Sequence, residues 1–582
     1  MCRIIFVREK KEIQVPEGTT VLEAEIRAGL APDAPCGGHG ICGKCLVRIL
    51  SQKDGDRADA PGSLVRACRT EVRSDLWVDT CTDPEQEHVI LTEGFTRPVP
   101  CQPDLMVHLV RLTKPEPGEK RSDWERLLLA LQAAGGPEPS WVRPDPVLAS
   151  SLYERRQEAA EWWVIHTKTQ ILDLRREPGK QYLAAFDIGT TTVAGYLLDA
   201  GDGSQTAVVS RMNPQAQYGA DVIARANYAL TNGTEPLSRC IRELIRQMLE
   251  QLAAEAGVRT EEIFQVSVAG NTCMHHLFLG ISPASLVHAP YTPALRQSLV
   301  LSAAEYGLGI HPRGQLRVLP DIAGYVGADT CGCLLALRPD QRPEVTLLLD
   351  IGTNGEMVLG NRDRLIACST AAGPAFEGAR IECGMRGAAG AVDHVSFENG
   401  IWHYTTVGGQ PAAGLCGSGL IDLVACLLRA GLIDESGTLA SGQEDPRVFM
   451  LAPPGESARE AGVYLTQKDI REVQLAKAAI AAGISLLMEE LGISEDEVAC
   501  VWLAGAFGNY MDPASAAEIG MLPKSLAARV QPVGNAAGQG AKIALLNREE
   551  WEQADALAEQ VGFLELATLP TFQDCFVDEL GF

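Results

Sequence analysis

Positive charge is scarce in this sequence: 50 Lys and Arg stand against 75 Asp and Glu, which gives a formal net charge of −25. A chain this acidic repels phosphate backbones, so nucleic acids and anionic membrane surfaces are poor partners. The sequence also lacks a run of about 18 apolar residues, and we expect no membrane-spanning helix. Within its first ten residues, MCRIIFVREK, charged residues come directly after a short apolar stretch, so no secretory signal is expected.

Disulfide scaffolding is also not indicated. Scaffolds of that kind are typical of short secreted domains, whereas this chain has 582 residues and 17 cysteines. We expect a cytoplasmic protein with mostly reduced thiols, some of which are available to hold a metal. The length predicts about three to five domains, and the composition, with 46% hydrophobic and 21% charged residues, is that of globular proteins.

The first 80 residues predict a small β-rich unit. The stretch TVLEAEIRAGL at 20–30 begins with a threonine of the kind that caps helices and has helical apolar spacing. The loop APCGGHGICGKC follows it. Short β-prone stretches lie before and after, at 2–7, 12–15, 46–50 and 76–78. This order predicts a β-grasp fold for residues 1–82.

Three regions follow. Residues 83–103 contain four prolines and are expected to be a linker. Residues 104–180 predict a small α+β middle domain without a chemical motif, with helices near 124–134 and 148–162 and one strand within 164–174. From 181 to 582, apolar strands that end in glycine loops alternate with helices, which predicts an α/β region. AFDIGTTTVAG at 185–195 and LLDIGTNGEMVLG at 348–360 form an internal repeat that indicates two duplicated lobes.

Four cysteines have the spacing C-x5-C-x2-C-x22-C: Cys36, Cys42, Cys45 and Cys68. Thiolates are soft ligands that suit iron–sulfur clusters or zinc, and three close cysteines with a distant fourth are typical of a [2Fe–2S] cluster. The loop glycines let the backbone turn tightly around the metal. A structural zinc site is the alternative, although zinc usually takes two C-x2-C pairs. Cys68 is the least secure ligand, and Cys81 is its nearest rival.

The cysteine loop resembles the ferredoxin family, and its five-residue first gap is similar to the adrenodoxin-like variant.

The two Asp-Ile-Gly-Thr loops begin at Asp187 and Asp350. A strand that ends in such a turn can present backbone N–H groups and threonine hydroxyls to phosphate. Two loops facing each other would hold one nucleotide between lobes, with the aspartates directed at Mg²⁺ or at a polarised water. Glu356 and Glu377 are weaker candidates for contact with Mg²⁺-bound water.

Further glycine strings follow: VAGNTC at 268–273, AAGPAFEGARI at 371–381, GLCGSGLID at 414–422, WLAGAFGNYM at 502–511 and VGNAAGQGA at 533–541. In this order they resemble the ATPase family that includes actin, heat-shock chaperones and sugar kinases. The resemblance implies ATP and Mg²⁺ as ligands. It assigns Asp187, Gly189, Thr190, Thr191 and Thr192 to the first phosphate loop, Asp350, Gly352, Thr353 and Asn354 to the second, and Gly417, Ser418, Gly419, Gly505, Ala506 and Phe507 to the adenosine end.

The whole chain resembles the reductive activators of corrinoid-dependent proteins. The strings that carry this resemblance are NPQAQYGADVIARANYA at 213–229, VAGNTCMHHLFLGISP at 268–283, LPDIAGYVGADT at 319–330 and AGAFGNYMDPASAAEIGMLP at 504–523. The resemblance implies one-electron, ATP-dependent reduction of a corrinoid protein from Co(II) to Co(I). Such an enzyme would serve a methyltransferase, O-demethylase or acetyl-CoA-pathway system. An unidentified low-potential electron donor and a homodimer are also implied.

Three other functions fit parts of the pattern. An activator of radical dehydratases has a similar ATPase but carries a four-iron cluster between its subunits, and the N-terminal cysteine loop argues against it. A small-molecule kinase with a metal-binding domain would need a pocket for an acceptor hydroxyl between the lobes. An electron carrier with degenerate lobes is disfavoured by the two intact aspartates. Neither the corrinoid partner nor the reductant can be named from the sequence.

Overall fold

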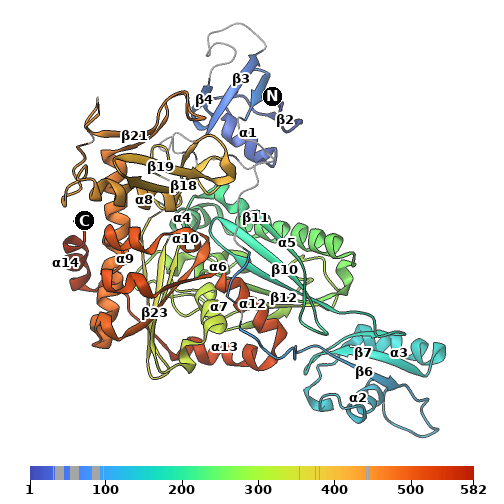
Figure 1. Cartoon of the computed structure of the whole chain (residues 1–582). Coiled ribbons are helices and arrows are strands. Elements are labelled where there is room, and N and C mark those ends of the chain that lie inside the picture. The colour runs from blue at the N-terminus through green and yellow to red at the C-terminus, as the bar shows by residue number, and fades with distance from the viewer. Residues whose placement is uncertain are drawn as a thin grey trace.

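The N-terminal unit is a five-stranded mixed sheet with one helix (Figure 1). Here and below, a computed structural model describes residues 1–30, 32, 34, 38, 45–52, 64–80, 92–95, 97–352, 354–373, 375–378, 380–440, 442–443 and 445–582, and of 51, 52, 506, 507 and 509 it describes the backbone only. The strands run in the order β2 (Lys11–Val15), β1 (Cys2–Phe6), β5 (Leu76–Asp79), β3 (Leu46–Gln52) and β4 (Leu64–Arg66). Helix α1 (Val21–Arg27) begins at Thr20, whose side chain forms a capping box with Glu23. The predicted β-grasp is therefore confirmed, with β4 as an unexpected edge strand.

Residues 106–175 form a separate three-stranded antiparallel sheet with two helices, α2 (Asp123–Ala133) and α3 (Pro146–Glu158). The single strand expected within 164–174 is wrong, because two strands are found there, β7 (Glu161–His166) and β8 (Ile171–Arg175), beside β6 (Met106–Arg111). The turn between them contains neither Gly nor Pro. It closes because Thr167 N–H donates to the Gln170 carbonyl (2.8 Å) and the Thr167 hydroxyl oxygen accepts from Gln170 N–H (3.1 Å).

Part of the expected linker pairs with the rest of the chain. Residues 92–95, which we call the strap, lie along β24 (Val530–Gly534): Phe95 N–H donates to the Val533 carbonyl (2.8 Å) and Asn535 N–H donates to the Glu93 carbonyl (3.0 Å). The backbones approach so closely that a Cβ on Gly94 would lie 2.9 Å from Asn535 backbone atoms. Glycine at position 94 therefore permits the contact.

The remaining chain forms two lobes, each around a six-stranded sheet (Figure 1). In both, a central strand pairs antiparallel with the next strand and parallel with a later one: β9 with β10 and β12, and β15 with β16 and β23. The predicted duplication is thus present in the strand pairing. The first sheet comprises β11 (Gln205–Met212), β10 (Thr192–Asp199), β9 (Tyr182–Ile188), β12 (Ile263–Gly270), β14 (Gln315–Val318) and β13 (Leu299–Ser302). The second comprises β24, β23 (Val498–Ala504), β15 (Val345–Ile351), β16 (Gly355–Gly360), β17 (Leu365–Thr370) and β25 (Val561–Phe563).

Helices and small sheets cover the two lobes. The first lobe has α4 (Val222–Asn232), α5 (Glu235–Ala256) and α6 (Thr272–Leu279), and the second has α8 (Gly417–Arg429), α9 (Gln467–Leu491), α10 (Gly505–Tyr510), α11 (Pro513–Glu518), α13 (Arg548–Gln560) and α14 (Pro570–Asp578), with the strands β18 (Ala391–Glu398), β19 (Ile401–Thr406), β20 (Gly414–Leu415), β21 (Val448–Ala452) and β22 (Val463–Thr466). In the described ranges, no helix has the length and apolar character needed to cross a bilayer.

Two helices join the lobes at the centre of the molecule, α7 (Ala328–Leu337) and α12 (Ala536–Leu546) (Figure 1). Helix α12 follows β24 of the second sheet but packs against β9 and β12 of the first. Both helices belong to one apolar core that also contains buried residues of both sheets. They cross at glycines: a Cβ on Gly540 would lie 1.9 Å from the Gly332 carbonyl oxygen, and a Cβ on Gly332 would lie 2.8 Å from the Ala537 carbonyl oxygen.

Replacing Gly540 with alanine should separate these helices. Alanine gains about 1 kcal/mol of helix propensity, but overpacking typically costs about 1–3 kcal/mol and occasionally more, and here the clash is with backbone that cannot move aside. We therefore expect Gly540→Ala to lower the free energy of unfolding of the two-lobed region by about 2 kcal/mol or more, measured by urea denaturation.

The matched control is Gly562→Ala, because a Cβ on Gly562 in β25 meets its nearest atom at an ordinary 3.4 Å. Equal stability of the two variants would contradict the close crossing of α7 and α12.

Candidate functional site

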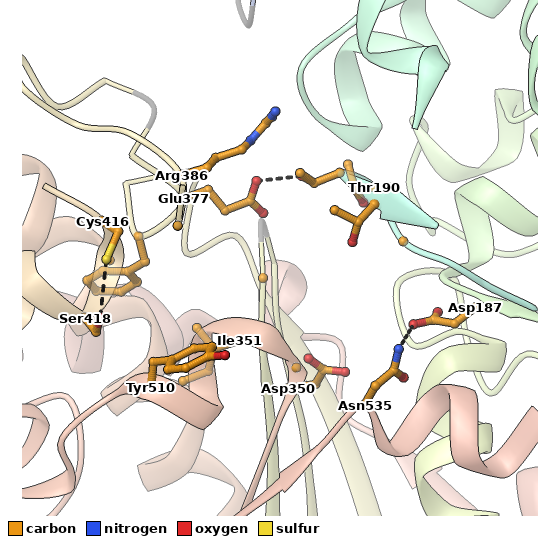
Figure 2. A pocket seen from close by; sticks show the side chains of 18 of the residues that line it. Asp187, Thr190, Asp350, Ile351, Glu377, Arg386, Cys416, Ser418, Tyr510 and Asn535 are labelled. Carbon is orange, nitrogen blue, oxygen red and sulfur yellow. Dashed lines mark hydrogen bonds between the residues drawn. The ribbon is translucent and has the colours of Figure 1, made fainter. Parts of the chain in front are cut away.

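A cavity of about 510 Å³ lies between the two lobes (Figure 2). Most of the residues assigned to the phosphate loops and the adenosine end line it: Asp187, Gly189, Thr190, Thr191, Thr192, Asp350, Gly352, Asn354, Gly417, Ser418 and Gly505. Gly419 does not; its Cβ position is 2.2 Å from the Val392 carbonyl oxygen, so it packs against β18. Thr353 and the side chains of Ala506 and Phe507 lie outside the described residues.

Both loops are tight connections between paired strands. Residues 189–192 connect β9 to β10 after the Ile188–Val193 pair, and a Cβ on Gly189 would lie 2.8 Å from the Thr192 carbonyl oxygen. Asp187 and Asp350 occupy equivalent places near the ends of the central strands β9 and β15, one in each lobe. The strand repeat seen in the sequence therefore brings the two aspartates to opposite sides of one cavity (Figure 2).

Four carboxyl groups line this cavity, of which Glu356 is buried and Asp187, Asp329 and Asp350 are half-buried. Burial is the main reason that the pKa of Asp187 rises to about 7, and nearby Asp350 adds to the rise while a hydrogen bond from Asn535 opposes it. Burial likewise raises the pKa of Asp350 to about 6. Burial, followed by the charges of neighbouring carboxylates, raises the pKa values of Asp329 and Glu356 well above the ordinary range. Such a set of oxygen donors is suited to a hard divalent cation.

Asp329 was not identified from the sequence. It is the second residue of α7 and reaches the cavity because Gly327, just before the helix, packs directly on the backbone of Asn271 and Thr272, where a Cβ would lie 2.4 Å from the Thr272 nitrogen. It lies in the string LPDIAGYVGADT, whose sequence gives no sign that Asp329 faces a site. Glu356 lies opposite Asp350 in the β15–β16 pair.

Side chains from both lobes meet across the cavity. The Thr191 hydroxyl donates to Glu377 Oε2 (2.7 Å), and Asn535 Nδ2 donates to Asp187 Oδ2 (2.9 Å) (Figure 2). Gly505 has a φ of +83°, and a Cβ there would lie 2.8 Å from Asp350 Oδ1. Two hydrogen bonds between side chains of different lobes, and the close packing of Gly505 on Asp350, thus bring the two lobes together around the acidic side chains.

The N-terminal unit brings two of the four predicted metal-ligating cysteines together. Cys45 directly precedes β3 and Cys68 follows β4, and the Ala67 N–H donates to the Cys45 carbonyl at 2.7 Å. Both cysteines are buried, and a Cβ on Gly38, whose φ is +85°, would lie 3.9 Å from Cys68 Cβ. Gly38, between the predicted ligands Cys36 and Cys42, therefore lies beside Cys68. Cys36, Cys42 and the rival Cys81 lie outside the described residues.

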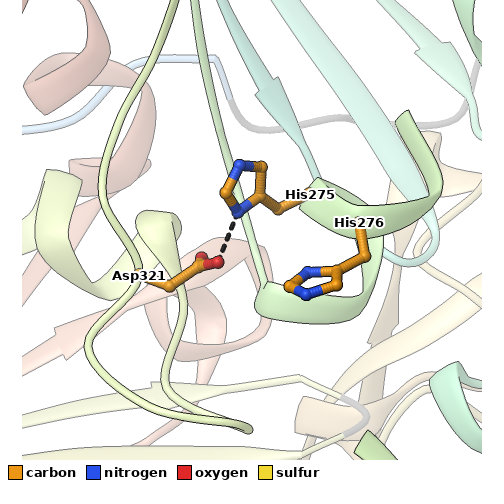
Figure 3. A group of neighbouring side chains, drawn as sticks. All are labelled: His275, His276 and Asp321. Atoms are coloured by element: carbon orange, nitrogen blue, oxygen red, sulfur yellow. Dashed lines mark hydrogen bonds and ion pairs between the residues drawn. The ribbon is translucent and has the colours of Figure 1, made fainter. Parts of the chain in front are cut away.

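A second cluster of metal-binding residue types is made by His275, His276 and Asp321 (Figure 3). Their ligating atoms lie within 4.8 Å of one another. However, both ring nitrogens of His276 are occupied, since Nδ1 bonds the Thr272 carbonyl and Nε2 accepts from Ala294 N–H. Asp321 bonds His275 with one oxygen and accepts from Ala328 N–H, at the start of α7, with the other. The cluster therefore ties α6 to α7 and supports the cavity.

Comparison with protein families matches three consecutive parts of the chain. Residues 5–73 match the 2Fe-2S iron-sulfur cluster binding domain, 182–342 match the RACo middle region, and 344–582 match the C-terminal domain of RACo, the ASKHA domain. The [2Fe–2S] assignment of the cysteine loop and the actin-like ATPase assignment of the two lobes are thereby confirmed.

Curated relatives are similar over most or all of the chain. The corrinoid activation enzyme RamQ of Eubacterium limosum is 34% identical, over 99% of this chain and 98% of its own. A [Co(II) methylated amine-specific corrinoid protein] reductase of Methanosarcina barkeri is 27% identical, over 69% of this chain and 77% of its own. Among solved structures, a reductive activator for corrinoid, iron-sulfur protein matches with a TM-score of 0.74 and 33% identity, over 100% of this chain and 98% of its own.

The raised carboxyl pKa values predict how a divalent cation binds in the cavity. A cation binds the ionised form, so below a pKa of about 7 for Asp187 and about 6 for Asp350 its binding must displace protons. We expect the affinity for Mn²⁺, used in place of Mg²⁺, to rise at least tenfold between pH 5.5 and pH 8, with net proton release.

Calorimetry in buffers of different ionisation enthalpy counts the protons released, and Asp187→Asn should reduce that count. Affinity that stays constant with pH would contradict the protonated state of these buried acids.

Proposed function

The chain belongs to the family of corrinoid-protein activators, and we propose that it uses ATP to return a corrinoid protein from inactive Co(II) to Co(I). The observation that carries this proposal is the presence, in one chain similar throughout to such activators, of a [2Fe–2S] unit and a two-lobed cavity rich in carboxylates. The reaction transfers one electron from the reduced cluster to cobalt, so the cluster is oxidised by the same single electron.

The ATP site is the cavity between the lobes. Residues 189–192 and the second loop supply donors for the phosphates, while Gly417, Ser418 and Gly505 line the end assigned to adenosine. Asp187, Asp350, Asp329 and Glu356 offer the oxygens that Mg²⁺ prefers, and the ion would offset their negative charge as well as that of ATP. Asp187 and Asp350 are the residues to which we assign ATP hydrolysis.

The cluster is held by Cys36, Cys42, Cys45 and Cys68 and supplies the electron when bound. Placement of Cys45 and Cys68 at adjacent strand ends supports this ligand set.

ATP is needed because the electron transfer is uphill. A plant-type cluster has a reduction potential of about −400 mV. For each 100 mV by which the Co(II)/Co(I) potential lies below that of the cluster, the transfer of one electron costs about 2.3 kcal/mol. Nucleotide can supply that energy only if it binds two states of the protein, or of its complex with the corrinoid partner, with different affinity. Contacts that cross the cavity, such as Thr191 to Glu377, are suited to respond to nucleotide.

Several finer assignments complete the proposal. We divide the chain into a cluster unit at 1–82, a linker at 83–103, a middle domain at 104–180 and an ATPase at 181–582. The middle domain exposes the apolar side chains of Leu109, Trp141, Val147 and Tyr153, which agrees with a homodimer through this domain. A low-potential donor would reduce the cluster. A cytoplasmic location agrees with the lack of disulfides among the fourteen cysteines that the structure describes.

Replacing Asp350 with asparagine should separate ATP use from folding. The variant keeps the size of the side chain but loses a ligand for Mg²⁺, so ATP-dependent reduction of a Co(II) corrinoid protein should fall at least about a hundredfold. Its cluster content should be unchanged, and its thermal stability should not decrease because a buried carboxyl group is removed.

The control is Asp363→Asn, whose side chain is 80% exposed. Full ATP-dependent reduction by Asp350→Asn would refute the role given to Asp350.

The role of Cys68 as a cluster ligand is tested by EPR spectroscopy and sulfide analysis. Cys68→Ser should lose the rhombic S = 1/2 EPR signal of the dithionite-reduced protein and its acid-labile sulfide. Cys2→Ser, which changes a buried cysteine of the same sheet, should keep both. If Cys68→Ser kept its cluster, the result would contradict Cys68 as the fourth ligand and indicate another cysteine in that role.

A further inference from the structure

Three consecutive carbonyl groups of the first phosphate loop accept hydrogen bonds from residues that do not line the cavity. Asn213 Nδ2 donates to the Gly189 carbonyl (2.8 Å), Arg225 Nη2 donates to the Thr190 carbonyl (2.6 Å), and Asn213 N–H donates to the Thr191 carbonyl (2.8 Å). In a trans peptide the N–H group points opposite to the carbonyl that precedes it. The N–H groups of Thr190, Thr191 and Thr192 are therefore directed away from these buried donors.

Arg225 is a fully buried cation whose hydrogen bonds go to carbonyl and sulfur atoms, while the charges of Glu377 and Asp221 favour its charged form without such a bond. Its side chain is 0% exposed, and its other donors reach the Gly219 carbonyl (2.9 Å) and the Met274 sulfur (3.2 Å). Burial lowers the pKa of Arg225 to about 10, which still leaves the guanidinium charged at neutral pH. A buried charge of this kind is unfavourable unless an opposite charge comes close.

Asn271 sets the hydroxyl of Thr190 in the same loop. Its Oδ1 accepts from Met274 N–H (3.0 Å) and so caps α6, which fixes its amide orientation. Its Nδ2 then donates to Thr190 Oγ1 (3.0 Å). Because that oxygen already accepts a hydrogen bond, the Thr190 hydroxyl is left to act as a donor toward a ligand.

The cavity itself has little positive charge. Among the described residues that line it, six are acidic and Arg386 is the single basic one. A polyphosphate approaching this surface meets repulsion from carboxylates that Mg²⁺ offsets only in part.

We infer that Arg225, Asn213 and Asn271 are positioning residues that preset the first phosphate loop for a nucleotide polyphosphate, with Arg225 supplying countercharge from behind the loop. This inference rests on the proposed ATP site and gives a role to the strings 213–229 and 268–273. Of the three residues, only Asn271 lines the cavity. Arg225 and Asn213 therefore act on a ligand through the loop.

The test compares a ligand with phosphates and one without. Arg225→Met removes the charge and the contact to the Thr190 carbonyl, so the affinity for Mg·ATP should fall at least tenfold, whereas the affinity for adenosine should stay within twofold. Arg225→Lys keeps the charge and should recover part of the ATP affinity. Isothermal titration calorimetry measures both ligands on the full-length protein.

Asn271→Asp is the second variant, chosen because it keeps the oxygen that caps α6. It loses the donor to Thr190 and adds negative charge, so it should also weaken ATP at least tenfold and spare adenosine. The control is Arg242→Met in α5, which removes an arginine that donates to the Phe278 carbonyl (2.8 Å) and stacks on Tyr306, away from the cavity. It should leave both affinities unchanged.

Each outcome decides a different point. If Arg225→Met or Asn271→Asp binds ATP as tightly as the wild type, or loses ATP and adenosine in parallel, the inference is overturned. If Arg225→Met does not fold, Asn271→Asp decides by the same criteria. Wild-type protein that binds no ATP would instead overturn the proposed function.

Discussion

The close crossing of α7 and α12 is the contact on which the rest of the ATPase depends. At Gly332 and Gly540 the two helices touch backbone to backbone, and each is adjacent to residues that face the cavity. Asp329 lies in the first turn of α7, and Asn535 lies immediately before α12. Since α12 starts from the second sheet and packs on the first, the crossing joins the lobes and sets how far apart their aspartates lie. A side chain at either glycine would therefore shift Asp329 and Asn535 and change the distance between the aspartates of the two lobes.

The cavity is organised around a charge problem. Burial raises the pKa values of four carboxyl groups here, and neighbouring carboxylates add to the rise for Asp187, Asp329 and Glu356, so without a cation the site holds protons. A nucleotide adds more negative charge. In the proposed function, two sources of positive charge answer this: a divalent cation among the acids and the buried guanidinium of Arg225 behind the loop. The chain's net charge of −25 makes both more important, because no general positive field attracts the nucleotide.

Sequence reasoning found the residues whose chemistry is written in a local pattern. The cysteine spacing and the repeated Asp-Ile-Gly-Thr loops led to the cluster unit, the two lobes and the part of the cavity lining that the two loops form, because each motif lies in one turn beside its own strand. Asp329 was missed, since a lone acid in a helical first turn looks like an ordinary favourable helix end. The pairing of residues 92–95 with β24 was missed because it joins segments more than 400 residues apart and is made by backbone atoms. The β7–β8 turn was missed because a threonine closes it in place of glycine or proline.

The strap gives Asn535 two partners at once. Its side chain bonds Asp187 in the cavity, and its backbone N–H bonds Glu93, in the segment that leads to the iron–sulfur unit. These two contacts are made by the same residue, so a displacement of Asn535 would disturb both the Asp187 contact and the pairing of the strap. The segment that leads to the iron–sulfur unit is therefore fixed to the protein by the same residue that bonds a cavity aspartate. In the proposed function, Asn535 would couple the ATP site to the position of the electron-donating unit.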